Sequence, residues 1–262
     1  MVESGFFILI GLLSGIVSGM TGASGVMILI PVLTSFFGYS LYEAVGTSLM
    51  ADVISSPFIA YTYYQNNHLD IKAAIWLILG AIIGAQVGVE GTHIFPDAWV
   101  IAAFSIALFG LGIKFWYDGV LQKFKEKDKN SKPWVEGTSQ RIIAGLVLGF
   151  LLGVMTGIFG AGGGILYFLV LHFVLQLDLK TSIGTAAFAM IASSISAAWG
   201  HWQGGNLNVD MGILLGASAA AGGMLSGYIA THTSEATLSK VVGGIFIILS
   251  IVMLVMRIGG SA

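Results

Sequence analysis

Long apolar stretches dominate the sequence and leave little polar chain between them. A helix that crosses about 30 Å of hydrocarbon needs about 20 residues. Apolar segments fall at roughly 5–20, 22–37, 42–64, 72–92, 97–117, 140–158, 161–176, 180–202, 208–230 and 235–257. Charged residues make up only 9% of the 262 residues, too few to solvate the surface of a soluble domain. We therefore predict an all-α, polytopic membrane protein. The composition argues against a soluble enzyme or a disordered protein, and the net charge of −2 argues against a nucleic-acid partner.

One polar stretch divides the chain. Residues 118–141 hold six of the eleven Lys and Arg residues. Because basic loops stay on the cytoplasmic side of a membrane, we expect 118–140 to be a cytoplasmic basic linker of a multi-pass protein in the cell (inner) membrane. Both chain termini then lie outside. The expected domains are a first transmembrane repeat over 1–117 and a second over 141–262.

The two halves align with each other at a constant offset of 138 residues. Residues 14–33 fall on 152–171, and residues 44–56 fall on 182–194, with the glycines and a Gly-Thr pair in register. Each half holds five segments, and an odd number inverts the second copy relative to the first. We therefore predict two inverted five-segment repeats with Gly-broken or re-entrant helices, an arrangement typical of secondary transporters. A duplicated channel or scaffold is the alternative.

Two glycine-rich sequences, MTGASG at 20–25 and IFGAGGG at 158–164, interrupt apolar segments at corresponding positions. Non-helical backbone at membrane depth is buried in protein or lines a cavity, and the N–H groups that open the following helix favour an anion. We predict that a small anionic substrate binds between these breaks. The candidate ligands are Gly22, Ala23, Ser24, Gly25, Gly160, Ala161, Gly162 and Gly163. Tight turns with nothing bound are the alternative.

Polar residues in the third and eighth segments add to this site. The hydroxyls of Thr47, Ser48 and Thr185 are candidate donors to an oxyanion, although such hydroxyls often bond to a carbonyl four residues back. Asp52 lies near the expected midplane, where a carboxylate is a functional candidate by default. We expect it to carry a coupling proton or to bind a cation. The alternative is a carboxylate that is hydrogen-bonded to a nearby Ser or Tyr. Its counterpart in the second copy is Met190.

The pattern resembles the sulfite exporter TauE/SafE family of membrane permeases. The resemblance rests on SGMTGASG at 18–25, Pro31 and AVGTSL at 44–49, with a second copy at 157–164 and 183–185. It implies export of a small sulfur-containing oxyanion, such as sulfite, or of an organosulfonate. The second copy departs from the first at Leu169, which replaces Pro31, and at Ala186, which replaces Ser48. These departures leave the substrate open.

Two other functions compete with a carrier. A passive anion channel would use the same site without alternating access. A rhomboid-like serine protease would use Ser24, in a Gly-Ala-Ser-Gly sequence, with His201 as its base, but the second copy lacks this serine. We place His201 at the membrane interface instead and expect no enzyme. No histidine spacing indicates a metal site, and we expect no cofactor. Beyond the lipid bilayer, glycine ladders that pair helices leave a homodimer open.

Overall fold

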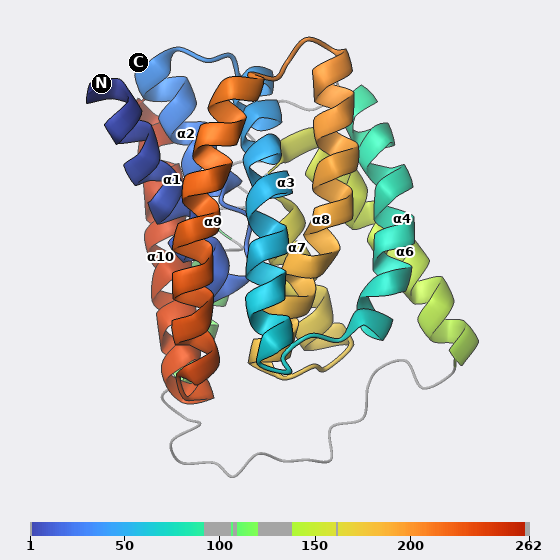
Figure 1. The fold of residues 1–262 in the computed structure, drawn as a ribbon. Helices are drawn as coiled ribbons and strands as arrows, with labels where there is room; N and C mark the ends of the chain where they lie inside the picture. Colours follow the sequence, from blue (N-terminus) through green and yellow to red (C-terminus); the bar gives the residue numbers. More distant parts are fainter. Residues whose placement is uncertain (1, 92–105, 107–108, 120–137, 161, 260–262) are drawn as a thin grey trace. The chain divides into compact units, whose positions relative to one another are not determined.

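The computed structural model describes residues 2–91, 106, 109–119, 138–160 and 162–259. The chain divides into two compact units (Figure 1). The first unit comprises Met1–Thr92 and Lys132–Thr231, and the second comprises His93–Ser131 and His232–Ala262. Among the described residues every regular element is helical.

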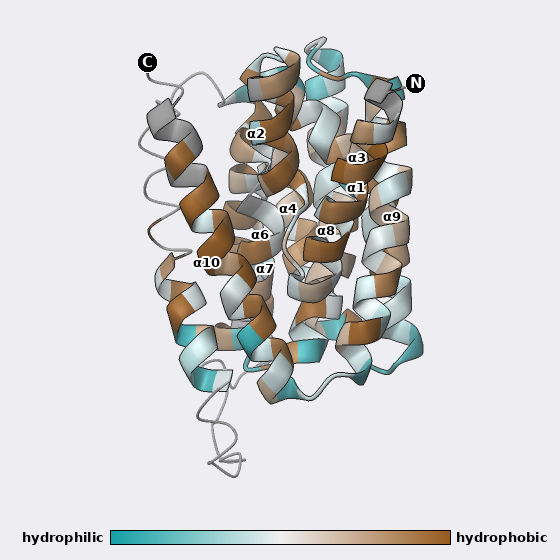
Figure 2. Ribbon diagram, turned by 90° about the vertical axis from the view of Figure 1, so that its left-hand side faces the viewer, coloured by the Kyte–Doolittle hydropathy of each residue, from teal (hydrophilic) through white to brown (hydrophobic). Residues whose placement is uncertain are grey.

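The first unit holds the helices that carry the candidate site. They are α1 (Val2–Thr21), α2 (Val26–Phe37), α3 (Leu41–Gln65), α4 (Ile71–Glu90), α6 (Thr138–Phe159), α7 (Gly162–Leu169) with a π-helical turn η1 (Val170–Val174), α8 (Leu179–Gln203) and α9 (Val209–His232). Apolar residues cover the middle of these helices, and polar residues gather at their ends (Figure 2). Five helices of the described chain are long and apolar enough to cross a membrane: α4, α6, α8, α9 and α10 (Glu235–Gly259). The predicted polytopic all-α membrane protein is confirmed.

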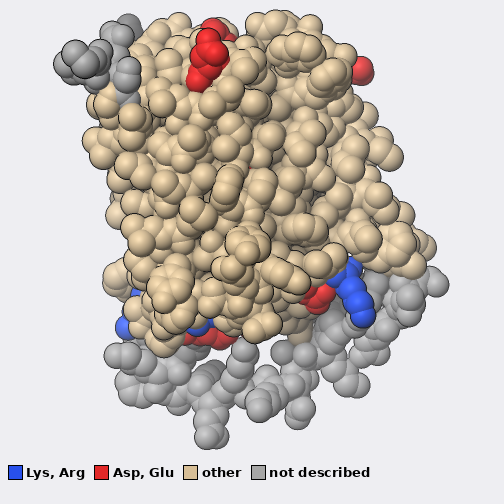
Figure 3. All heavy atoms as spheres, viewed as in Figure 1, with Lys and Arg blue, Asp and Glu red and all other residues tan. Residues whose placement is uncertain are grey.

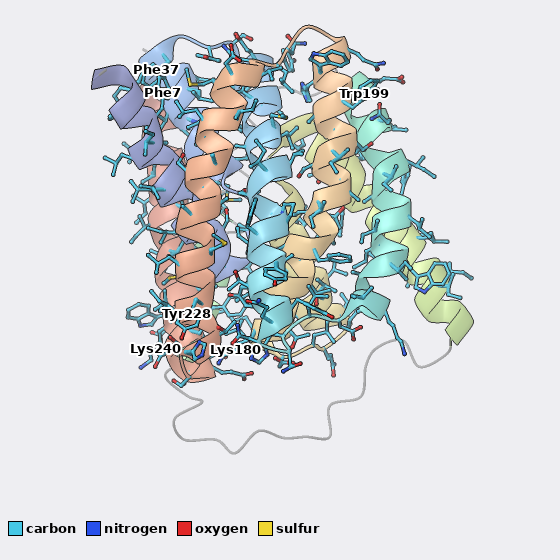
Figure 4. All side chains as sticks on the ribbon, in the orientation of Figure 1. Phe7, Phe37, Lys180, Trp199, Tyr228 and Lys240 are labelled. Atoms are coloured by element: carbon cyan, nitrogen blue, oxygen red, sulfur yellow. The ribbon has the colours of Figure 1, made fainter. Side chains whose placement is uncertain are left out.

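Helices α1 and α2 form a hairpin that enters from one end of the first unit and returns to it. The 12 residues of α2 span only about 18 Å, too short to cross a bilayer. The ring of Phe7, early in α1, lies 4.3 Å from that of Phe37 at the end of α2 (Figure 4). The α6–α7 pair repeats this design, because the 8 residues of α7 and the 5 of η1 are also too short. The broken helices are therefore re-entrant hairpins.

Glycine ladders bring the helices of the first unit into backbone contact. A Cβ atom built on Gly80, Gly84 or Gly88 of α4 would overlap a carbonyl oxygen of α6, at Leu146, Phe150 and Val154 respectively. Glycines 11, 15 and 19 of α1 meet α9 in the same way, at residues 215, 219 and 223. Both numbering series rise together, so α4 runs parallel to α6, and α1 runs parallel to α9. The ladders are packing surfaces, as predicted.

Helices α3 and α8 are sequence equivalents in the two copies and run in opposite directions (Figure 1). A Cβ atom on Gly46, near the start of α3, would lie 2.9 Å from the Cβ of His201 at the end of α8. A Cβ atom on Gly184, near the start of α8, would lie 2.5 Å from the Cβ of Tyr63 at the end of α3. The first contact becomes the second when the copies are exchanged.

The second unit is described by residues 109–119, which are helical, and by α10. The hydroxyl of Ser239 donates to the carbonyl oxygen of Phe115 at 2.8 Å. The rings of Phe115 and Phe246 meet edge to face at 6.1 Å.

Candidate functional site

Each re-entrant hairpin turns at a glycine with left-handed backbone. Gly22 has a φ of 66° and Gly160 a φ of 59°, a region that residues with a Cβ atom rarely occupy. Their N–H groups end the preceding helices in the same way, by donating to the carbonyl oxygens of Ser18 at 2.9 Å and Thr156 at 2.8 Å. Both breaks therefore use one local geometry, which requires glycine at these two positions.

The two breaks contact each other. A Cβ atom on Gly164, near the start of α7, would overlap the backbone nitrogen of Ser24 and lie 2.6 Å from the carbonyl carbon of Ala23. On the other side of its own hairpin, a Cβ atom on Gly163 would lie 2.6 Å from the Thr156 hydroxyl. Gly162 is the first residue of α7, and Ala161 lies outside the described residues. The contact between the breaks thus joins Ala23 and Ser24 to Gly164, which the predicted set did not include, and substrate binding by the predicted residues stays a prediction.

The donors of the first break are largely occupied by the protein itself. The Ser24 hydroxyl donates to the carboxylate of Asp52. The N–H of Val26 donates to the Ser24 hydroxyl oxygen at 3.1 Å, and the N–H of Ala23 donates to the hydroxyl of Thr21 at 3.0 Å. Asp52 is therefore hydrogen-bonded to a nearby serine, and its role in coupling stays a prediction.

Thr47 and Thr185 hold the loops that open α9 and α4. The N–H of Asn208 donates to the Thr47 hydroxyl at 3.0 Å, and the N–H of Asp70 donates to the Thr185 hydroxyl at 3.0 Å. Asp70 is also the N-cap of α4 and accepts from Ala73 at 3.0 Å. Asn208 accepts likewise from Met211 in α9 at 3.1 Å. Each of the two bonds becomes the other when the copies are exchanged. Neither cap was expected from the sequence.

The tie at Thr47 has a further partner in Tyr39, which lies in the loop between α2 and α3. The side-chain amide of Asn208 donates to the Tyr39 hydroxyl at 3.2 Å. Burial, and then the neighbouring Glu43 carboxylate, raise the pKa of Tyr39. The phenol therefore stays neutral.

Tyr63 and His201 support the helices that lead into the breaks. The Tyr63 hydroxyl donates to the carbonyl oxygen of Gly19 at 2.7 Å, and Nε2 of His201 lies 3.1 Å from the carbonyl oxygen of Gly157. A carbonyl only accepts, so this contact requires a proton on Nε2. Both side chains are buried. His201 lies in the last turn of α8 and is buried against the protein, so its placement at the membrane interface stays a prediction. The alignment of His201 with Tyr63 was the available signal of its burial.

Ser48 is fully buried, and its hydroxyl has no hydrogen-bond partner in the described structure. It lies four residues before Asp52 in α3, so the two side chains share one face of the helix. A buried hydroxyl without a partner is costly. Ser48 is therefore the residue of the predicted set whose hydroxyl is left to donate to a ligand or to a rearranged neighbour.

Ser24 and His201, the residues of the protease alternative, have separate partners in the described chain. Ser24 is bonded to Asp52 and His201 to Gly157, so no serine–histidine hydrogen bond joins them in the described chain. The described residues also contain no group of three or more His, Asp or Glu side chains that could hold a metal ion. What the site does offer is neutral hydroxyls, backbone N–H groups and one carboxyl.

Comparison with known proteins identifies the family of the chain. The sequence matches the family described as "Sulfite exporter TauE/SafE" over residues 7–255. Two proteins of Bacillus subtilis are similar to it. "Probable membrane transporter protein YdhB" is 28% identical over 196 residues, 74% of this chain and 77% of that protein. "Probable membrane transporter protein YunE" is 22% identical over 240 residues, 85% and 86% of the two chains. No solved structure matches significantly. The chain is a multi-pass membrane protein and belongs to the sulfite exporter TauE/SafE family of transporters.

Proposed function

We propose that the protein is a secondary transporter that exports a small sulfur-containing oxyanion, such as sulfite, or an organosulfonate, by alternating access. The observation that carries this proposal is the contact between the two breaks, at Gly164 and Ala23–Ser24. Two helix N-termini that meet at membrane depth attract an anion without a buried lysine or arginine. Family membership favours transport over catalysis.

Alternating access is supported by the relation between the copies. Equivalent helices α3 and α8 run in opposite directions (Figure 1). The Thr47–Asn208 and Thr185–Asp70 bonds are equivalents at opposite ends of the first unit, and so are the Gly46–His201 and Gly184–Tyr63 contacts. An inverted repeat explains both facts. If the two copies exchanged their conformations, the site would then open to the other side of the membrane.

The distribution of charged residues supports the proposal that this is a protein of the cell (inner) membrane with its basic linker in the cytoplasm. Lys72 and Lys180 lie in the first turns of α4 and α8, at the end of the first unit where the Asp70–Thr185 bond lies. The acidic Glu43 and Asp210 open α3 and α9 at the other end. The basic side chains of the face in Figure 3 gather at its lower end. By the positive-inside rule, the end with Lys72 and Lys180 faces the cytoplasm.

Asp52 is the proposed coupling residue, because it is the carboxyl group buried at the contact between the breaks, with 3% of its surface exposed. A carboxylate at membrane depth is a functional candidate by default, because it can bind a proton or a cation there. In proteoliposomes, Asp52→Asn should abolish the response of flux to a proton gradient while anion binding persists. Unchanged coupling would reject this role.

The substrate is tested by binding and then by flux. Purified protein in detergent is heated with sulfite, thiosulfate, sulfate, sulfonates, carboxylates or chloride, because a ligand of the folded state raises the melting temperature. We expect stabilisation by a sulfur oxyanion or sulfonate. We expect it to be lost, together with flux, in Gly22→Val and Gly162→Val proteins that still reach the membrane. Normal flux in both variants would refute the site. Flux at channel rates would replace the carrier with a channel.

A further inference from the structure

We propose that Asp52 is a tethered competitor of the substrate: its carboxylate occupies the Ser24 hydroxyl at the start of α2, and an anion binds there only after that carboxylate has moved to Ser48. This inference rests on the proposed anion site and adds how that site is filled when no substrate is bound. It also assigns a role to Ser48, the buried hydroxyl that has no partner.

The first step is that the hydroxyl donor at the start of α2 is taken. The Ser24 hydroxyl donates to the carboxylate of Asp52, which reaches it from α3. This is a donor that a substrate oxyanion would use at the first break. Two anions cannot share it, because like charges at hydrogen-bond distance repel strongly where water is excluded. Substrate therefore has to displace the carboxylate.

The second step is that the two copies differ at this point. The position of Ser24 is taken by Gly162 in the second copy, and that of Asp52 by Met190. The second break thus has neither the carboxylate nor the hydroxyl that holds it. Other features are shared by both breaks, including the left-handed glycine and the bond that ends the preceding helix. A carboxylate that served only to close the backbone turn would be needed twice. Its presence in one copy indicates a task beyond turn formation.

The third step is that the displaced carboxylate has a destination. Side chains on a helix lean toward its N-terminus, so Asp52 leans toward Ser48, one turn earlier on the same face. The Ser48 hydroxyl is buried and has no partner in the described structure. It can donate to a carboxylate that has left Ser24. The second copy has Ala186 there, which fits the absence of a carboxylate to receive.

The test is a double-mutant cycle on binding of sulfite and thiosulfate to the purified protein at one fixed pH. Asp52→Asn removes the competing charge and keeps the shape of the side chain. It should tighten the apparent dissociation constant about tenfold or more, the scale of one hydrogen bond to a charged group. Asp52→Glu keeps the charge and should therefore not tighten binding. Asp210→Asn removes the same charge from the first turn of α9 and controls for net charge.

Ser48→Ala should change anion binding in the opposite direction to Asp52→Asn. The variant should also fold, because the Ser48 hydroxyl has no hydrogen bond to lose in this conformation. It should weaken binding several-fold in the wild-type background and have no effect in the Asp52→Asn background. Equal weakening in both backgrounds would make Ser48 a direct substrate ligand and overturn the proposed transfer. Equal or weaker binding by Asp52→Asn would overturn the competition.

The outcomes also separate this inference from the proposed function. Binding by the wild type that Asp52→Asn does not improve refutes the competition alone. Binding by Asp52→Asn without measurable binding by the wild type supports the competition, and wild-type flux then decides the function. No anion bound by any variant refutes both.

Discussion

One of the closest helix contacts of the first unit gives a sharp test of the fold: Gly84→Ala should destabilise the protein. The added Cβ atom would overlap the carbonyl oxygen of Phe150, and it would lie 2.8 Å from the Phe150 carbonyl carbon and 3.0 Å from the Val154 nitrogen. Favourable carbon contacts lie at about 3.5–4.0 Å. All three neighbours are backbone atoms of α6, so no side chain can rotate away, and the two helices have to separate.

The size of the effect follows from two opposing contributions. Overpacking a close contact costs about 1–3 kcal/mol, and the rigid backbone partner places this site in the upper part of that range. Alanine in a helix interior gains back up to about 1 kcal/mol over glycine. The net loss is about 1–2 kcal/mol, which lowers the melting temperature by roughly 2–8 °C for a chain of this size.

The matched control is Gly5→Ala in α1, where no atom lies within 4 Å of the added Cβ. This change should leave stability unaltered or raise it slightly through helix propensity. Both variants are purified in the same detergent and unfolded by heat, with circular dichroism as the readout. If Gly84→Ala is as stable as Gly5→Ala, then α4 and α6 do not pack backbone to backbone, and the parallel arrangement derived from the glycine ladders is wrong.

Further predictions concern the breaks and the threonine ties. Gly22→Ala should cost about 1–2 kcal/mol for its left-handed backbone, and more for the Ile183 Cα atom 3.0 Å from the new Cβ. Gly38 also has a positive φ, but no atom lies within 4 Å of a Cβ atom built there. Gly38→Ala should therefore lower the melting temperature less than Gly22→Ala. Equal drops would contradict the packing of the break. Thr185→Val should leave the Asp70 N–H unpaired at a cost of about 1–3 kcal/mol, and Thr47→Val should lose a similar amount by chemical unfolding. A loss in one variant alone would show that the two ties are not equivalent.

Glycine positions made much of this fold predictable from sequence. The ladders and the breaks depend on close backbone approach and on positive φ, two requirements that glycine meets best, and both are visible in the spacing of the residue itself. The offset of 138 residues then paired the glycines of the two breaks, Gly22 with Gly160 and Gly25 with Gly163. The re-entrant alternative for the short segments followed from length alone.

The side-chain partners could not be predicted in the same way. Thr47 bonds to a residue 161 positions away, and Thr185 to one 115 positions away. No local pattern encodes such a pair, because any hydroxyl on the buried face of a helix has the same sequence signature. The partners expected from the sequence were a bound oxyanion or a carbonyl of the same helix. Neither is a residue far away in the chain. The duplication carried part of the information: once one of the two bonds is known, the offset gives the other.

The differences between the two repeat copies bear on the direction of transport more than their similarity does. Under alternating access, two identical copies would make the inward-open and outward-open states equal in energy, since each state is the other with the copies exchanged. A transporter of that kind would have no built-in preference for either side. The pair formed by Ser24 and Asp52 breaks this equality, because Gly162 and Met190 replace it in the second copy. The state in which the Asp52 carboxylate of α3 holds the start of α2 then has no equivalent at α7, so the two states differ in energy. The buried carboxyl is therefore placed where it can bias the resting conformation as well as compete with the substrate, and a single residue links the two effects.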